Sequence, residues 1–307
     1  MSYIPMYIES HRSGELEKRI DALHEILTEC RLCPRECNVN RLSGEVGVCR
    51  GGAELMVSSA SPHFGEEPPL VGFHGSGTIF LTHCNLRCVF CQNYDISHFG
   101  SGYTVTSSEM ANYMLRLQRM GTHNINFVTP THYIPQIVAS LPEAIESGLK
   151  IPLVFNCGGY ESLDVIRLLD GIMDIYMPDF KYSDESTAKK YSNSPDYPGK
   201  IKGALMEMHR QVGDLKIDRD GIAERGLLIR HLVMPKALAG TRDLMEFIAS
   251  DISKDSYVNI MAQYRPLYKA SEFPEINRRI TPQEYKEAVE IAKIAGLYRG
   301  FSPISSF

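Results

Sequence analysis

Three cysteines in the first third of the chain have a spacing that predicts chemistry. Cys84, Cys88 and Cys91 stand in FLTHCNLRCVFCQNYDIS with the pattern C-x-x-x-C-x-x-C. Three thiolates on one loop can hold three irons of a [4Fe–4S] cube, because cysteine thiolate is the usual ligand of such clusters. The fourth iron then lacks a protein ligand, and catalysis needs such an open position. Structural zinc is the alternative, but no fourth cysteine or close histidine completes this loop.

Four other cysteines form a second group near the N-terminus, in CRLCPRECNVNRLSGEVGVC. They are Cys30, Cys33, Cys37 and Cys49. Four thiolates can close a complete site that suits structural zinc, a rubredoxin-like iron or an auxiliary [4Fe–4S] cluster. The sequence leaves these three open, although the short span favours a mononuclear structural metal. We expect Gly44 and Gly47 to allow the tight turns that return Cys49 to the metal.

Composition narrows the class of protein. The chain has 307 residues, 32 basic and 37 acidic, for a net charge of −5, and 43% of them are hydrophobic. This charge argues against nucleic-acid binding, which usually requires a basic surface. No apolar run approaches the roughly 18 residues of a membrane helix, and no secretory signal is visible. We therefore expect a cytoplasmic protein, in which clustered cysteines bind metal rather than form disulfides.

Short apolar runs alternate with helical patterns after residue 76. The expected strands span 77–83, 124–130, 152–156, 173–179, 227–235 and 257–262. The expected helices lie near 107–120, 132–147, 160–169, 199–212, 239–251 and 281–296. Such alternation predicts a parallel sheet with right-handed crossovers. Six units are two fewer than in a closed (β/α)₈ barrel, and a doubly wound sheet would show the same alternation.

The N-terminal part differs from this pattern. An amphipathic helix is expected at 15–29, a loop-built cysteine knuckle at 30–52 and a short strand at 54–60. We therefore expect a division into residues 1–56, the helix and four-cysteine metal-binding segment, and residues 57–307, the barrel.

Two further segments are candidates for a role at the site. His63, Glu66 and Glu67 lie in PHFGEEPPL just before the barrel and are candidates for contact with substrate or metal, with a surface turn as the alternative. The polar, tyrosine-rich segment 182–213 is a candidate lid or partner-docking surface, with a solvated loop as the alternative.

On the cysteine motif the chain resembles radical S-adenosylmethionine (SAM) enzymes, over roughly residues 75–265. Within that superfamily it is similar to the pyruvate formate-lyase activating enzyme and to uncharacterised iron–sulfur relatives with an N-terminal four-cysteine extension. The resemblance implies an α/β fold, a partial (β/α)₆ TIM-like barrel, preceded here by the small N-terminal helix and cysteine knuckle. It also implies that Cys84, Cys88 and Cys91 are the cluster ligands.

The resemblance implies SAM contacts at residues that end or follow the expected strands. They are Phe90, Asn93, Asn156, Met177, Asp179, Lys181 and Arg230. Asp179 and Lys181, in MPDFK, would face the ribose and carboxylate region of SAM and a bound alkali cation, and Arg230 would lie near the carboxylate. An ordinary ion pair between Asp179 and Lys181 is the alternative.

Two segments depart from the family pattern. VTPTHY (128–133) stands where a Gly-Gly-Glu motif is usual, and we expect Thr129 and Thr131 to supply carbonyls or a hydroxyl to SAM instead. The alternative for Thr131 is a helix cap. FNCGG, with Asn156, replaces an Asp-Thr-Asn-Gly segment, which puts the cation site in doubt.

The implied activity is reductive cleavage of SAM at a [4Fe–4S] cluster, which gives a 5′-deoxyadenosyl radical for hydrogen abstraction. A glycyl radical enzyme is one candidate substrate, so that the chain would be its activase. A small metabolite or another peptide is the alternative. The implied electron donor is a flavodoxin or ferredoxin. The rival from a different class is a non-enzymatic iron–sulfur electron carrier, which would leave Asp179, Lys181 and Arg230 unexplained.

Overall fold

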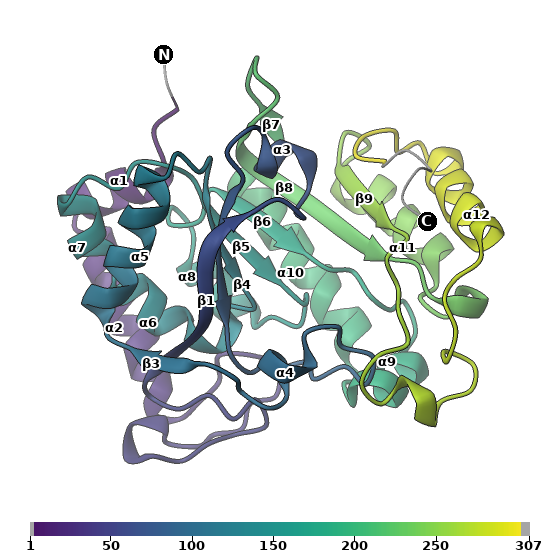
Figure 1. Cartoon of the computed structure of the whole chain (residues 1–307), viewed down its shortest axis with the longest axis horizontal. Coiled ribbons are helices and arrows are strands. Elements are labelled where there is room, and N and C mark those ends of the chain that lie inside the picture. The colour runs from purple at the N-terminus through teal and green to yellow at the C-terminus, as the bar shows by residue number, and fades with distance from the viewer. Residues whose placement is uncertain (1–2, 302–307) are drawn as a thin grey trace.

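A parallel sheet that does not close organises the chain. The computed structural model describes residues 3–301, and in that range it has a nine-stranded sheet of order β3–β1–β2–β4–β5–β6–β8–β7, with β9 paired to β8. Strands β2, β4, β5, β6, β8 and β9 run parallel, which confirms the expected partial barrel of six strands (Figure 1). The bounds are β1 Leu55–His63, β2 Ser76–Leu81, β3 Tyr103–Val105, β4 Ile125–Val128, β5 Leu153–Cys157, β6 Ile175–Pro178, β7 Lys216–Ile217, β8 Ala223–Leu232 and β9 Tyr257–Met261.

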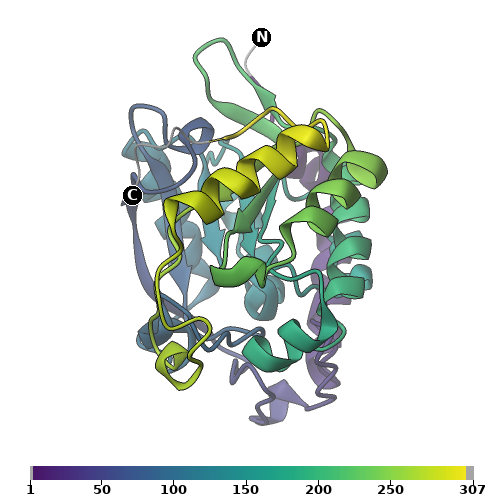
Figure 2. The ribbon, with the colours of Figure 1, turned by 90° about the vertical axis from the view of Figure 1, so that its right-hand side faces the viewer.

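Helices cover the outer face of the sheet (Figures 1 and 2). The helices α5, α8, α10, α11 and α12 agree with expected stretches, the stretch 132–147 is divided into α6 and α7, and α3, α4 and α9 were not expected. Both α5 and α12 begin with capping boxes, Thr106–Glu109 and Thr281–Glu284. Between residues 3 and 301 no helix could span a membrane. The bounds are α3 Pro68–Val71, α4 Tyr94–Ser97, α5 Ser107–Arg119, α6 Ile134–Ala139, α7 Leu141–Glu146, α8 Leu163–Leu168, α9 Glu185–Ser192, α10 Tyr197–Val212, α11 Thr241–Phe247 and α12 Pro282–Ile294.

Alternation along the central strands separates the barrel interior from the helical layer. On β5, Phe155 joins the main core with the helices, whereas Val154 belongs to a second cluster with Ile175 and Met177. Asn156 follows on the face of Val154. The barrel interior is therefore apolar along the strands and becomes polar at their carboxyl ends. Active sites of such barrels form at those ends.

The N-terminal helices pack into the same core. They are α1 Met6–Arg12 and α2 Glu15–Glu25, and α1 was not expected from the sequence. Tyr7, Leu16 and Leu23 are fully buried in the main core. The buried Asp174 accepts hydrogen bonds from the Met6 and Leu153 amides, both at 2.8 Å, and so ties α1 to β5. The expected division between residues 56 and 57 falls inside β1.

The tyrosine-rich segment 182–213 is neither a lid nor a solvated loop. It forms α9 and α10, and Tyr182, Tyr191 and Tyr197 are buried in the main core. The polar residues around these rings conceal their packing, because Tyr191 and Tyr197 lie on the buried sides of α9 and α10 and Tyr182 precedes α9.

Candidate active site

One cavity lies at the carboxyl ends of the parallel strands. Its volume is about 390 Å³, and all three cysteines of the C-x-x-x-C-x-x-C motif line it. Seven of the nine residues expected to contact SAM also line it. They are Phe90, Asn93, Thr129, Asn156, Asp179, Lys181 and Arg230. Residues from loops and strands far apart in the sequence thus line the same cavity.

The loop that carries the three cysteines joins β2 to α4 and is folded by its own backbone. His83 and Arg87 both have left-handed backbone conformations, which turn the chain sharply around Cys84 and Cys88. The Leu86 amide donates to the sulfur of Cys84 at 3.4 Å, and the Cys91 amide donates to the Cys88 carbonyl at 3.2 Å. The loop is therefore shaped so that its sulfurs face the cavity.

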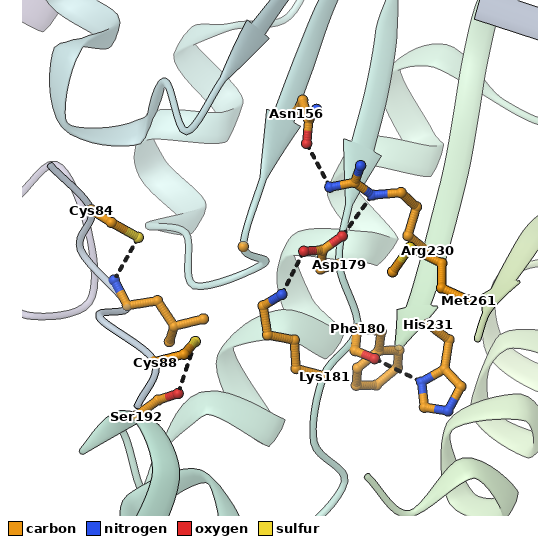
Figure 3. A network of polar contacts seen from close by, with 12 residues as sticks. Cys84, Cys88, Asn156, Asp179, Phe180, Lys181, Ser192, Arg230, His231 and Met261 are labelled. Atoms are coloured by element: carbon orange, nitrogen blue, oxygen red, sulfur yellow. Dashed lines mark hydrogen bonds and ion pairs between the residues drawn. The ribbon is translucent and has the colours of Figure 1, made fainter. Parts of the chain in front are cut away.

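Hydroxyl groups from other segments reach two of the sulfurs. Ser192, the last residue of α9, donates to the Cys88 sulfur at 3.2 Å (Figure 3). The Ser97 hydroxyl lies 3.1 Å from the Cys91 sulfur. Spacing could not have revealed Ser192, which is 104 residues from Cys88. Hydrogen bonds to sulfur stabilise thiolates, so these contacts suit a metal ligand better than a neutral thiol.

The donor set fits an iron–sulfur cluster. All eight cysteines are free of disulfides. Burial raises the pKa of Cys84 to about 12, so that without metal the thiol keeps its proton. Among residues 3–301 no three His, Cys, Asp or Glu side chains already converge on one ion position. Each thiol must therefore lose its proton when it binds an iron.

A carboxylate that bridges two cations dominates the opposite wall (Figure 3). Asp179 accepts from Lys181 Nζ at 2.5 Å and from Arg230 Nε at 2.6 Å. Asn156 Oδ1 accepts from Arg230 Nη2 at 2.7 Å. Burial by itself would raise the pKa of Asp179, but Arg230 and Lys181 hold it below the ordinary value. The Asp179 carboxylate is therefore ionised at neutral pH. Its ion pair with Lys181, which was the alternative to a role at the site, exists and lies at the cavity wall.

Carboxylates that precede the barrel extend this charged wall. Glu66 lies 3.8 Å from Arg230 Nη1 and 2.9 Å from His63 Nδ1, and both residues line the cavity. Glu67 is buried, lies 4.0 Å from Arg230 Nε and accepts from Asn259 Nδ2 at 2.9 Å. Burial raises the pKa of Glu67, against the lowering effect of Arg230. His63 and Glu66 are thus placed for contact with a substrate.

The remaining lining residues are held by neighbouring elements. Phe90 packs against Tyr264 with ring centroids 5.5 Å apart and is almost fully buried. Thr129 has a φ of 61°, which is rare for a β-branched residue, and its amide donates to the Asn156 carbonyl at 2.8 Å. Such strain is common where a backbone turn serves a site. The turn at VTPTHY thus reaches the cavity through Thr129.

Two of the residues expected to contact SAM, Thr131 and Met177, do not line the cavity. Thr131 is buried and its hydroxyl donates to Glu161 at 3.0 Å. It does not cap the following helix with its side chain. Met177 belongs to the apolar cluster inside the barrel, below the cavity. Since Met177 pairs across the sheet with Asn156, it lies close to the site without lining it.

The N-terminal cysteines form a compact knuckle, residues 30–52, whose amides face sulfur. The Val48 amide donates to Cys37 Sγ at 3.4 Å, and the Gly51 amide donates to Cys49 Sγ at 3.3 Å. A Cβ on Gly47 would lie 2.7 Å from Cys37 Sγ, so only glycine fits there. Gly44 has the positive φ that was expected, at 89°. Thiolates that accept several amide hydrogen bonds are typical of metal-binding knuckles.

Comparison of the sequence with known proteins identifies a matching family and two similar proteins. The radical SAM superfamily matches residues 78–215. The chain is 34% identical over 296 residues to the uncharacterized protein MJ0674 of Methanocaldococcus jannaschii, across 93% of this chain and 80% of that protein. It is 21% identical over 303 residues to the uncharacterized protein MJ0808 of the same organism, across 90% of this chain and 84% of that protein.

Two known structures are more distant. Native anSMEcpe with bound AdoMet and Cp18Cys peptide has a TM-score of 0.47 and 10% identity, over 72% of this chain and 60% of that one. HydG, a maturase of the [FeFe]-hydrogenase, has a TM-score of 0.47 and 14% identity, over 73% of this chain and 50% of that one. The chain therefore spans less than two thirds of either protein.

The chain belongs to the radical SAM superfamily. It is a radical SAM enzyme whose cofactors are a [4Fe–4S] cluster and SAM, and it carries out SAM-dependent radical chemistry.

The bridge at Asp179 leads to a prediction about stability. Replacing Asp179→Asn leaves Lys181 and Arg230 buried without their shared counter-charge, which should lower the free energy of unfolding by about 3–5 kcal/mol. Urea denaturation of the metal-free chain would measure it. The exposed Asp251→Asn is the control, and a loss no larger than the control's would mean that the bridge does not support the fold.

Proposed function

We propose that Cys84, Cys88 and Cys91 hold the [4Fe–4S] cluster and that SAM binds between the cluster and the bridge at Asp179. One observation carries this proposal: the same cavity is lined by the three cysteines and by the cations Lys181 and Arg230. The bound cluster supplies the electron that cleaves the sulfonium of SAM and releases a 5′-deoxyadenosyl radical for hydrogen abstraction.

The protein's own groups then orient SAM. Asp179 and Asn156 accept hydrogen bonds from Nε and Nη2 of Arg230, whereas Nη1 lies 3.8 Å from Glu66, beyond hydrogen-bond distance. Arg230 Nη1 and Lys181 Nζ would bind the carboxylate of SAM, because a guanidinium and an ammonium are the natural partners of that group. Phe90 would lie against the adenine, since its ring is a buried apolar surface at the cavity wall.

Asn93 and Thr129 complete the proposed contacts with SAM. Both line the cavity, Asn93 at the start of α4 and Thr129 at the end of β4. The backbone turn at Thr129 takes the place of the usual Gly-Gly-Glu motif and would present carbonyl oxygens to the amino group of SAM. The left-handed conformation of Thr129 supports this role, because strained backbone conformations are common where a turn serves a functional site.

For the substrate we propose a glycine of a partner glycyl radical enzyme, which makes the chain an activase. The similarity of MPDFK and Arg230 to the activating enzyme supports this assignment. The alternative is a small polar metabolite or another peptide. The ion pair of His63 with Glu66 favours this alternative, because it places polar groups inside the cavity. A flavodoxin or ferredoxin is the proposed electron donor.

Removal of one cluster ligand tests the reaction. In the variant Cys88→Ala the cluster loses one of its three thiolates, and we expect formation of 5′-deoxyadenosine from SAM and dithionite to fall to background. The product is measured by chromatography on anaerobically purified protein, with iron and sulfide content determined in parallel. Wild-type levels of product in Cys88→Ala would refute the ligand assignment. A wild-type cluster that never cleaves SAM would favour the electron carrier.

Loss of one cation tests the proposed position of SAM. Lys181→Met should weaken SAM binding by about tenfold, because a charge-assisted hydrogen bond to the carboxylate is lost. Equilibrium dialysis against the reconstituted protein measures the dissociation constant. Lys189→Met, on the exposed side of α9, is the matched control. Equal affinity in the two variants would place the SAM carboxylate elsewhere.

Isotope transfer distinguishes the substrates. An activase should transfer deuterium from a protein partner labelled at glycine into 5′-deoxyadenosine, whereas a metabolite enzyme should take label only from deuterated small molecules. Mass spectrometry of the product measures the transfer, with Cys88→Ala as the blank. Label from the small-molecule fraction alone would contradict the activase and support the alternative.

A further inference from the structure

An arginine of the N-terminal knuckle forms hydrogen bonds with the loop that carries Cys84, Cys88 and Cys91. Arg35 stands two residues after Cys33. Its guanidinium donates to the carbonyls of Asn85 and Leu86 at 3.1 and 3.4 Å, inside the C-x-x-x-C segment. Every one of these contacts joins residues about 50 positions apart in the sequence. The knuckle and the cluster loop therefore form one unit in space, at the same end of the molecule (Figures 1 and 2).

The same side chain also holds the end of α9. Arg35 Nη2 donates to the Ser192 carbonyl and to Ser194 Oγ, both at 2.8 Å, and Nη1 donates to the Asn193 carbonyl. The guanidinium carbon lies 5.1 Å from the centre of the Tyr160 ring. Because Ser192 gives its hydroxyl to the Cys88 sulfur, Arg35 fixes both the loop and the donor that serves one of its cysteines.

A second arginine points to what the knuckle contains. Arg41 is 1% exposed, and among residues 3–301 its hydrogen-bond acceptors are the neutral carbonyls of Gly52 and His132. A guanidinium keeps its charge in proteins, and a buried charge is costly unless an opposite charge compensates it. A Cβ placed on Gly51 would lie 3.3 Å from Arg41 Nη2 and 3.5 Å from Cys49 Sγ, so the guanidinium and the thiol lie close together. Four thiolates on a metal would supply the missing negative charge.

Arg41 has its own connection to the cluster loop. Its Nη1 donates to the His132 carbonyl at 2.6 Å, and His132 Nε2 lies 2.8 Å from the Thr82 carbonyl. Burial lowers the pKa of His132 to about 3, so the ring is neutral and donates this bond. Thr82 stands two residues before Cys84. The knuckle is thus connected to the cluster loop on both sides of Cys84. It contacts Asn85 directly and reaches Thr82 through His132.

We propose that Cys30, Cys33, Cys37 and Cys49 hold an anionic metal–thiolate centre, balanced by Arg41, which positions the catalytic cluster loop through Arg35. Loading forms four metal–sulfur bonds and releases four thiol protons to solvent, with no electron transfer. The centre fixes Cys33, and Arg35 is only two residues further along the chain, so the centre also fixes the start of the Arg35 side chain. The positioning role rests on the proposed function; the metal site does not.

The test compares five proteins as full chains purified without oxygen. They are the wild type, Cys37→Ser, Arg35→Lys, Cys88→Ala and the control Arg31→Lys. Arg31 is exposed in the same knuckle and lies 3.5 Å from Glu29. Zinc, iron and sulfide are quantified, and loss of the catalytic cluster to EDTA is followed by EPR of the dithionite-reduced protein, with and without SAM.

We expect the wild type and Arg31→Lys to hold metal beyond the four irons of the catalytic cluster. Cys37→Ser should lose this additional metal and release the catalytic cluster about tenfold faster. Arg35→Lys should keep the additional metal and show the same faster release, because the three donors of lysine cannot replace the five hydrogen bonds of the Arg35 guanidinium. Additional metal in Cys88→Ala would show that the knuckle binds metal whether or not the catalytic assignment holds.

Two results would overturn the proposal. Wild-type metal content in Cys37→Ser would refute the four-cysteine centre. Equal rates of catalytic-cluster loss to EDTA in Arg35→Lys and Arg31→Lys would refute the positioning role of Arg35. If Cys37→Ser fails to fold, Arg41→Met replaces it: faster loss of the additional metal to EDTA than in Arg31→Met supports the charge balance, and equal loss refutes it.

Discussion

The site depends on a buried carboxylate that holds two cations in place. Asp179 follows β6 and forms an isolated bridge with Arg230 on β8, so its position depends on the pairing of two strands. In water such an ion pair would contribute little, but here the three side chains are mostly buried and leave the cations aimed at a common hollow. A site preorganised in this way can meet the carboxylate of a ligand without rearranging its own charges.

Opposite that wall the chain concentrates sulfur at the same edge of the sheet. The catalytic loop follows β2, and the knuckle reaches it from the N-terminus through Arg35 and Arg41. Both arginines use the guanidinium fork to join carbonyl oxygens of separate segments, in a planar geometry that the compact ammonium of lysine does not reproduce. The N-terminal segment is therefore part of the catalytic end of the molecule, and its helices share the main core.

Particular residues show where prediction from sequence succeeds. The six strands were recognisable because buried parallel strands are short apolar runs. Seven of the nine residues expected to contact SAM line one cavity, because the carboxyl ends of parallel strands converge in a barrel. The side chain of Met177 lies outside the cavity because its neighbours fixed which of two alternating faces it occupies. The side chain of Thr131 lies outside it because the buried Glu161, thirty residues away, accepts its hydroxyl hydrogen bond.

The sequence by itself determined the class of chemistry, since the spacing of Cys84, Cys88 and Cys91 is a local property of one loop. It also determined the order of the six parallel strands and of the main helices between them, because periodicity is local too. Only the tertiary structure decided which distant groups meet: Ser192 with Cys88, Glu66 with Arg230, and Arg35 with the cluster loop. Such contacts depend on how the elements pack in three dimensions, and no spacing along the chain encodes them.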